Sequence, residues 1–229
     1  MRIIFVRHGE PNYELDCLTE KGHRQAEACA KRLEHEGISE IFASPMGRAA
    51  QTADYTAKLL GLPVETLDYM HEISWGGEGI PEKAHPWTLA ERMIAQDDYD
   101  FYHNEWREHL YFKTNDVMKY VNGISEQFDA LLLREGYRHE GTRFFCETDE
   151  PKNIAVFSHG GSGACVFSHL LALPFPYVCT VMPCGHTSIT ILNFPVRKGE
   201  FVHPRLELFN DTLHTVGVAT DLVIQQEST

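Results

Sequence analysis

Two histidines in this chain each follow a short apolar run and precede a glycine. The first motif is Arg7-His8-Gly9-Glu10, directly after residues 3–6, and the second is Ser158-His159-Gly160-Gly161, directly after residues 154–157. Such runs predict buried strands, and open α/β folds bind their ligands at the carboxyl ends of strands. The spacing therefore predicts two imidazoles and a guanidinium at one edge of a sheet.

These residue types suit the transfer of a phosphoryl group. Attack on phosphorus needs a nucleophile that is unprotonated near neutral pH, and an imidazole, whose ordinary pKa is about 6.5, meets that need. We assign this role to His8. Arg7 beside it, Arg48 in the first turn of a predicted helix and His159 at the second strand end can bind the equatorial phosphate oxygens.

A carboxyl group follows the third predicted strand. Glu72 stands in the segment His71-Glu72-Ile73-Ser74-Trp75-Gly76, soon after the strand predicted for residues 64–67. A carboxylic acid held partly protonated at the same sheet edge can protonate the leaving alkoxide and later activate water. Glu72 is therefore the candidate general acid.

Strand and helix patterns alternate along most of the chain. They predict an α/β fold, a three-layer sandwich whose mainly parallel mixed sheet carries helices on both faces. The predicted strands cover residues 3–6, 41–43, 64–67, 154–157, 188–193 and 205–209. The predicted helices cover residues 20–36 (N-cap Thr19), 45–60 (N-cap Ser44, first residue Pro45), about 115–133 (N-cap Thr114 or Asn115) and 163–173.

Two further segments complete this organisation. Residues 137–146 predict a hairpin that turns at Gly141. Residues 76–112 are rich in aromatic and acidic side chains and break the alternation, so we expect an inserted lid there. The whole chain, residues 1–229, is expected to be one domain.

Composition argues against several classes of partner. The chain has 229 residues and a formal net charge of -13, which disfavours a nucleic-acid backbone or an anionic membrane surface, because both attract basic faces. No long apolar core or cleavage signal follows Met1, so we expect neither secretion nor membrane insertion. The six cysteines are scattered and fit reduced thiols, so we expect a cytoplasmic protein.

One cysteine-containing segment raises the question of zinc. Cys179, Cys184 and His186 offer thiolate and imidazole groups, but no second pair of ligands follows at the spacing of a structural zinc site. We therefore predict no metal.

The motifs together resemble the histidine phosphatase superfamily, in its phosphoglycerate mutase-like branch. The matching blocks follow the family's order: Arg7-His8-Gly9-Glu10, Leu18-Thr19-Glu20-Lys21-Gly22, Ser44-Pro45-Met46-Gly47-Arg48, Glu72 with Trp75-Gly76, and Ser158-His159-Gly160-Gly161. The resemblance implies a phosphoglycerate mutase-like fold and a phosphohistidine on His8. It also implies that Arg7, Arg48 and His159 bind phosphate, that Glu72 is the acid, and that no metal or organic cofactor is needed.

The chain departs from the family pattern after the first block. Many members have Ser or Thr there and Asn three places later, whereas this chain has Pro11-Asn12-Tyr13-Glu14. Asn12 is the candidate substitute for that phosphate contact. The family often places a backbone contact to phosphate just before the strand predicted for residues 188–193, so we expect His186 to border the pocket.

The sequence favours a phosphatase that hydrolyses a small-molecule phosphate monoester. Mutases of this branch hold a second anionic group with an extra basic pair, whereas residues 78–100 are acidic and contain only Lys83 and Arg92 as basic residues. A mutase and a non-catalytic phosphate-ligand or protein-binding module remain the alternatives. The aromatic residues of the insertion indicate a substrate with an apolar or ring-bearing part, and they suit a homodimer contact as well as a lid.

Overall fold

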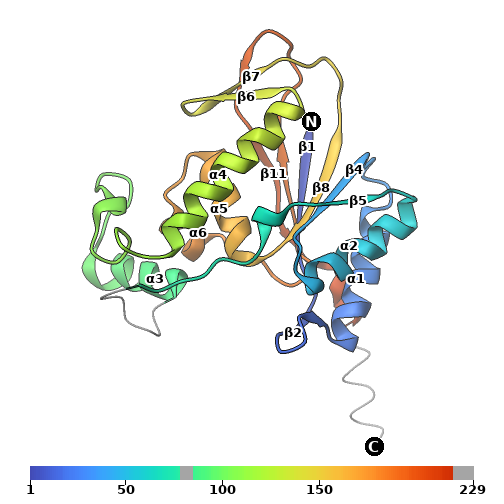
Figure 1. The fold of residues 1–229 in the computed structure, drawn as a ribbon, viewed down its shortest axis with the longest axis horizontal. Helices are drawn as coiled ribbons and strands as arrows, with labels where there is room; N and C mark the ends of the chain where they lie inside the picture. The colour runs from blue at the N-terminus through green and yellow to red at the C-terminus, as the bar shows by residue number, and fades with distance from the viewer. Residues whose placement is uncertain (78–84, 219–229) are drawn as a thin grey trace, which may run out of the picture.

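The computed structural model describes residues 1–77 and 85–218, which fold around one central sheet (Figure 1). Its strands are β1 (Arg2–Arg7), β4 (Glu40–Ala43), β5 (Val64–Thr66), β8 (Asn153–Ser158), β9 (Ile189–Asn193) and β11 (Arg205–Asp211). The helices are α1 (Glu20–Leu33), α2 (Gly47–Leu60), α3 (Pro86–Asp97), α4 (Val117–Arg134), α5 (Gly160–Leu171) and α6 (Phe175–Val181). Short strands β2 (Pro11–Asn12) and β3 (Cys17–Leu18) pair with each other, and β6 (Tyr137–Glu140), β7 (Arg143–Cys146) and β10 (Phe201–Val202) form a third sheet.

The central sheet is mixed and mainly parallel, as predicted. Its strand order is β11-β9-β1-β8-β4-β5. The strands β1, β8, β4 and β5 run parallel to their neighbours in this set, whereas β9 runs antiparallel to both β1 and β11. The carboxyl ends of β1, β8 and β4 therefore meet at one edge of the sheet.

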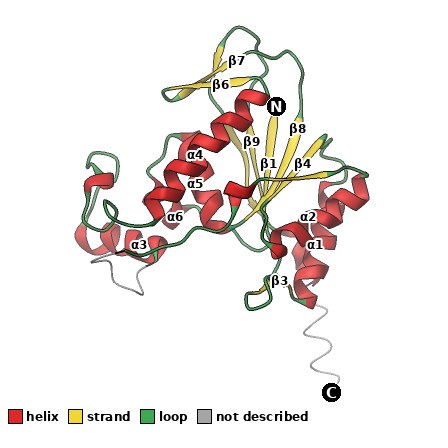
Figure 2. Ribbon diagram, viewed as in Figure 1, coloured by secondary structure: helices red, strands yellow, loops and turns green. Residues whose placement is uncertain are grey.

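Helices cover both faces of this sheet (Figure 2). On one face Ile4 of β1 belongs to an apolar cluster with Leu33 of α1. On the other face Phe5 packs on Phe167 of α5, with the ring centroids 5.1 Å apart. Successive side chains of a strand point to opposite faces, so a strand that is apolar at every position is stable only when both faces are covered. The predicted three-layer arrangement is confirmed.

The first helix begins where the sequence predicts but ends earlier. The Thr19 hydroxyl accepts a hydrogen bond from the Gly22 amide (3.0 Å) and so caps the first turn of α1. The helix ends at Leu33 and not at Glu36, because the last turn tightens into bonds between residues three apart. The amide of Glu36 donates to the Leu33 carbonyl at 3.0 Å.

The predicted start of α2 is wrong. Ser44 and Pro45 precede the helix, which begins at Gly47 with Met46 in the N-cap position. The Ser44 hydroxyl accepts from the Met46 amide (3.2 Å) and contacts Nε2 of His159 at 2.8 Å. This serine therefore stabilises a turn and a histidine instead of capping a helix.

The later helices also differ from the prediction at their ends. The Asn115 side chain accepts from the Val117 amide (3.1 Å), but α4 itself begins at Val117. The helix α5 begins at Gly160 and not at Gly163, because its first turn contains the glycines that the sequence assigns to a loop. The sequence analysis missed α6, which restarts the helical path directly after Pro174.

The described part of the insertion packs against α6. The Thr180 hydroxyl donates to the Trp87 carbonyl (3.2 Å), and Phe101, Trp106 and Phe112 are buried in the cluster that covers the α5 face of the sheet. Figure 1 shows this segment at the end of the molecule away from α1 and α2. Residues 78–84 lie outside the described residues, and the lid and the single-domain organisation stay predictions.

Two predictions about the rest of the chain can be compared directly with the structure. The hairpin is confirmed as β6 and β7, with Gly141 at a φ of 68° in its turn. Within residues 1–77 and 85–218, no single helix is long and apolar enough to cross a membrane; α5 and α6 pass that test only as a pair bent by 119°.

Candidate active site

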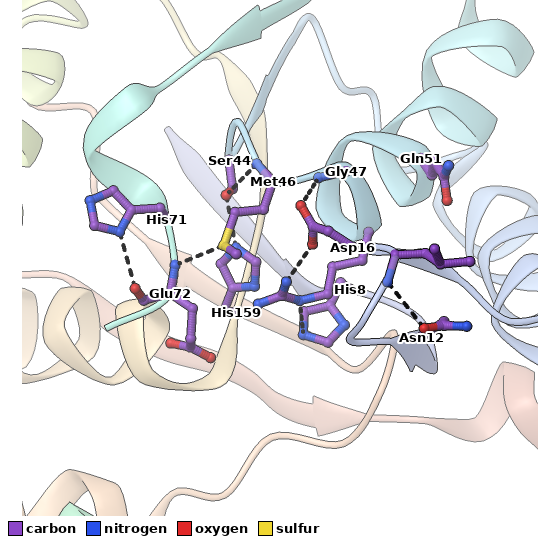
Figure 3. A network of polar contacts seen from close by, with 12 residues as sticks. His8, Asn12, Asp16, Ser44, Met46, Gly47, Gln51, His71, Glu72 and His159 are labelled. Atoms are coloured by element: carbon purple, nitrogen blue, oxygen red, sulfur yellow. Dashed lines mark hydrogen bonds and ion pairs between the residues drawn. The ribbon is translucent and has the colours of Figure 1, made fainter. Parts of the chain in front are cut away.

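The two predicted histidines meet at the carboxyl ends of neighbouring strands. The strands β1 and β8 are parallel, and Arg7 pairs in register with Ser158. The residues that follow each strand are thereby placed side by side, with the rings of His8 and His159 5.1 Å apart between centroids. Both side chains are buried, at 1% and 0% exposure, and Figure 3 shows them within one polar network.

The hydrogen bonds of His8 define which ring nitrogen can react. Nδ1 lies 2.8 Å from the Gly9 carbonyl, which can only accept, so the proton of the neutral ring sits on Nδ1. Nε2 accepts from Nε of Arg48 at 3.3 Å and keeps its lone pair. Burial lowers the pKa of His8 to about 3, with help from Arg7, Arg48 and His186. His8 is therefore a neutral imidazole whose unprotonated nitrogen is Nε2, which contacts Arg48.

The second histidine is bonded through its other ring nitrogen, Nε2. Ser44 accepts from the Met46 amide, and we assign its one hydroxyl proton to the contact with Nε2 of His159. Nδ1 of His159 then carries the proton, and it is buried with no hydrogen-bond partner among the described residues. Burial, followed by the charges of His8 and the two arginines, lowers the pKa of His159 to about 2. His159 is thus a neutral donor beside His8.

Two arginines supply positive charge to the same place. Arg7 donates from Nη1 to the Cys184 carbonyl (2.5 Å), while its Nε is buried and has no partner among the described residues. Arg48 lies in the first turn of α2, as predicted, and is 4% exposed. A buried, unpaired guanidinium N–H and a helix N-terminus both favour an anion.

Sequence reasoning missed the residue that holds Arg48. Asp16, in the loop between β2 and β3, accepts from Nη1 of Arg48 (2.5 Å) and from the Gly47 amide (2.7 Å). The close approach requires glycine at position 47, because a Cβ there would lie 2.2 Å from the Asp16 carbonyl oxygen. No spacing in the sequence links Asp16 to a helix that begins 31 residues later.

Glu72 is held by the N-terminus of α5. Its Oε1 accepts from the amides of Ile73 (2.9 Å), Gly161 (3.0 Å) and Ser162 (3.2 Å). Burial nevertheless raises the pKa of Glu72, because it outweighs these amides and the nearby arginines. Glu72 and Arg7 both line a cavity of about 540 Å³, so a carboxyl group with a raised pKa and a guanidinium group share one cavity.

The remaining two predicted site residues, His186 and Asn12, have different surroundings. The ring of His186 lies 5.7 Å from that of His8, and burial lowers its pKa to about 4. The side-chain oxygen of Asn12 accepts from the amides of Glu14 (3.1 Å) and Leu15 (3.2 Å). That oxygen is used within its own loop, so a contact of Asn12 with phosphate stays a prediction.

The cavity lies between the first turn of α5 and the insertion. Beyond Arg7 and Glu72, its wall includes Tyr13, Trp87 and Glu91, together with residues of α5 and α6. Arg7 comes from the end of β1, whereas Trp87 and Glu91 belong to α3. This arrangement suits a phosphate group at one end and the rest of a small molecule at the other.

Comparisons with known proteins agree with this geometry. Residues 3–133 match the family model of the histidine phosphatase superfamily (branch 1). A probable phosphoglycerate mutase GpmB from Proteus mirabilis is 25% identical over 235 residues, which cover 97% of this chain and 99% of the relative. A second, from Cronobacter sakazakii, is 27% identical over 183 residues and covers 76% of each chain.

Solved structures show the same fold. A phosphoserine phosphatase from Entamoeba histolytica, in complex with 3-phosphoglyceric acid, superposes with a TM-score of 0.63 at 25% identity, covering 94% of this chain and 99% of that one. A mycobacterial glucosyl-3-phosphoglycerate phosphatase in complex with VO3 gives a TM-score of 0.61 at 22% identity, with coverage of 91% and 98%.

Proposed function

This chain belongs to the histidine phosphatase superfamily, and on that premise we propose that it hydrolyses a small-molecule phosphate monoester through a phosphohistidine on His8. The observation that carries the proposal is the state of His8. Its Nδ1 is tied to the Gly9 carbonyl, its pKa is lowered to about 3, and Nε2 faces Arg48 and lies beside His159. A buried imidazole in this state is a nucleophile over the whole physiological pH range.

The first step transfers the phosphoryl group to the protein. Nε2 of His8 attacks phosphorus, the bond from phosphorus to the ester oxygen breaks, and Glu72 gives its proton to the departing oxygen. Arg7, Arg48 and Nδ1–H of His159 stabilise the charge on the equatorial oxygens. The products are a phosphohistidine, a free alcohol and the Glu72 carboxylate.

The second step returns the enzyme to its starting state. Water attacks the phosphorus of the phosphohistidine, Glu72 accepts a proton from that water, and the bond from phosphorus to Nε2 breaks. Inorganic phosphate leaves, His8 is again neutral, and Glu72 is again protonated.

The charges of the cavity favour hydrolysis over a mutase reaction. Arg7 is the only basic residue among the described cavity-lining residues, and it lies at the phosphate end, whereas Glu91 lies in the wall toward α3. A second anionic group on the alcohol would therefore face a carboxylate. Product analysis distinguishes the two reactions, since hydrolysis releases free phosphate and a mutase releases an isomerised ester.

A labelling experiment tests the covalent route. The protein is mixed with a phosphorus-labelled aryl phosphate and quenched in alkali. We expect label on His8, none in His8→Ala, and unchanged label in the control His35→Ala, whose side chain is exposed two residues beyond the end of α1. Full turnover by the wild type without any trapped label would rule out the phosphohistidine.

The location and partners of the protein remain to be tested. We propose the cytoplasm, since all six cysteines are unpaired. The proposed partner is the phosphate ester itself. The aromatic insertion is proposed as a lid or a homodimer contact. Sedimentation of the full chain distinguishes the two, because it shows whether the protein is a monomer or a dimer.

A further inference from the structure

We propose that Asp129, His139 and His169 form a binding site for a divalent transition-metal ion, with Zn²⁺ as the preferred physiological ion. The three residues come from α4, β6 and α5, and none of them is among the proposed catalytic residues. One potential ligand atom from each lies within 4.8 Å of the other two.

The ligand set has the composition that zinc prefers. Nε2 of His169 lies 2.6 Å from Oδ1 of Asp129, and Nδ1 of His139 lies 2.9 Å from Oδ2. Tetrahedral zinc with bonds of about 2.1 Å separates its ligand atoms by roughly 3.4 Å, so shifts of about 1 Å would admit the ion. Two imidazoles and one carboxylate favour zinc, nickel or cobalt over magnesium or calcium, which prefer oxygen ligands.

The arrangement and the surroundings of the three residues support the assignment. Asp129 contributes a carboxylate group that already contacts a ring nitrogen of each histidine, so all three potential ligands face one point. The ring of His139 stacks on Phe144 (4.5 Å between centroids, 16° between planes), which fixes its orientation. An imidazole in its neutral form can carry its proton on either ring nitrogen, so each ring can offer a lone pair to the ion.

The surface next to the three residues offers the ion a path of entry and a fourth coordination position. His139 and His169 line a surface cavity of about 410 Å³, and Glu105 and Arg107 also line it. A water molecule from this cavity can complete the coordination of an ion held by three protein ligands.

The proposed metal site lies away from the proposed catalytic centre. A bound ion would therefore affect the stability of the fold. His169 lies ten residues along α5 from His159, a rise of about 15 Å. A bound ion would tie the β6–β7 hairpin to α4 and α5, which Figure 1 shows side by side on one face of the sheet. We therefore expect zinc to stabilise the protein and to leave the chemistry at His8 unchanged.

The test measures zinc binding by the full-length protein after removal of any affinity tag and treatment with a chelator. Zinc chloride alone is the probe, followed by titration calorimetry and thermal unfolding. At a zinc concentration about 100 times the Kd, the unfolding midpoint should rise by roughly 5–10 °C. Magnesium and calcium should have no such effect.

Three ligand variants and one control locate the ion. Asp129→Asn, His139→Asn and His169→Asn should each weaken zinc binding at this site at least about 100-fold, because loss of an outer-shell partner alone costs 10–100-fold. The control His35→Asn should bind zinc as the wild type does. Turnover of an aryl phosphate without zinc shows that each variant is folded.

Cobalt gives a second measurement that does not depend on the stability of the variants. Co²⁺ bound to the wild type should show visible absorption bands typical of nitrogen and oxygen ligation, and zinc should displace it. The proposal is overturned if the wild type binds no zinc. It is also overturned if every variant keeps the zinc-dependent shift and the cobalt spectrum, because the three residues would then form only a hydrogen-bonded contact.

Discussion

The position of single protons decides what the catalytic residues can do. Nδ1 of His8 bonds to a carbonyl, whereas Nε2 of His159 bonds to a hydroxyl, and these two contacts leave opposite nitrogens facing the same space. One ring thereby presents a lone pair and the other presents an N–H. The two rings thus present different groups because their neighbours differ.

The tautomer of His159 provides a prediction about Ser44. Replacing Ser44 by Ala removes the hydroxyl that bonds to Nε2, so the proton should distribute between both ring nitrogens. We expect kcat for an alkyl phosphate to fall about tenfold, as for the loss of one hydrogen bond. Nitrogen NMR shifts of His159 measure the tautomer directly; an unchanged Nδ1–H tautomer in Ser44→Ala would contradict this role.

The raised pKa of Glu72 provides a prediction about leaving groups. An alkyl alcohol leaves only with a proton, whereas nitrophenolate leaves without one. Glu72→Gln should therefore lower kcat/KM for an alkyl phosphate by about 10²–10⁴-fold and that for nitrophenyl phosphate much less. For the wild type acting on the alkyl ester, activity should decline as pH rises through the raised pKa and Glu72 ionises. Equal losses for both esters would exclude Glu72 as the acid.

At the scale of elements, close backbone approaches hold the site together. The start of α2 lies against the loop that carries Asp16, and the start of α5 lies against Glu72. A Cβ at Gly161 would lie 2.5 Å from Oε1 of Glu72, as one at Gly47 would collide with Asp16. These glycines allow helix N-termini to contact acidic side chains directly.

A pair of glycine substitutions tests this element-level packing. Gly47→Ala should displace the Asp16 loop, release Arg48 and lower kcat/KM. Gly123→Ala in α4 is the matched control, because a Cβ there meets no atom within 4 Å. The control should keep full activity and gain about 0.5–1 kcal/mol in the free energy of unfolding, since alanine favours helix over glycine. Urea unfolding and steady-state kinetics measure both effects.

At the scale of the whole molecule, the fold removes three histidines from solvent: His8 and His159 are buried, and His186 is half-buried. The unfolded chain protonates histidine near pH 6.5, whereas burial lowers the folded-state pKa of His186 to about 4, of His8 to about 3 and of His159 to about 2. As pH falls below about 6.5, the unfolded state therefore binds more protons than the folded state. The raised pKa of Glu72 acts in the opposite sense, but for one group only.

This imbalance predicts an acid-sensitive fold. Between pH 6.5 and 4, the free energy of unfolding should fall by about 1.4 kcal/mol per pH unit for each of the three histidines, and it should not depend on them above pH 7. Urea unfolding at several pH values measures the slope. His186→Asn should reduce the slope, whereas His35→Asn should not, and equal slopes in all three proteins would contradict the prediction.

The sequence by itself determined the sheet and the meeting of His8 with His159. Apolar runs at residues 3–6 and 154–157 require burial on both faces, and the ends of adjacent parallel strands necessarily lie at one edge. Short-range patterns were therefore enough to predict that the two imidazoles meet, and the same reasoning placed Arg48 in the first turn of its helix.

Only the tertiary structure decided which groups surround these residues. The contact of Ser44 with His159, that of Asp16 with Arg48, and the grouping of Asp129, His139 and His169 join residues 10 to 115 positions apart. Such contacts depend on how helices pack against the sheet and on where each helix begins. The local sequence pattern does not show how elements pack. A polar residue at a helix end gives the same pattern whether its side chain caps the helix or contacts another element.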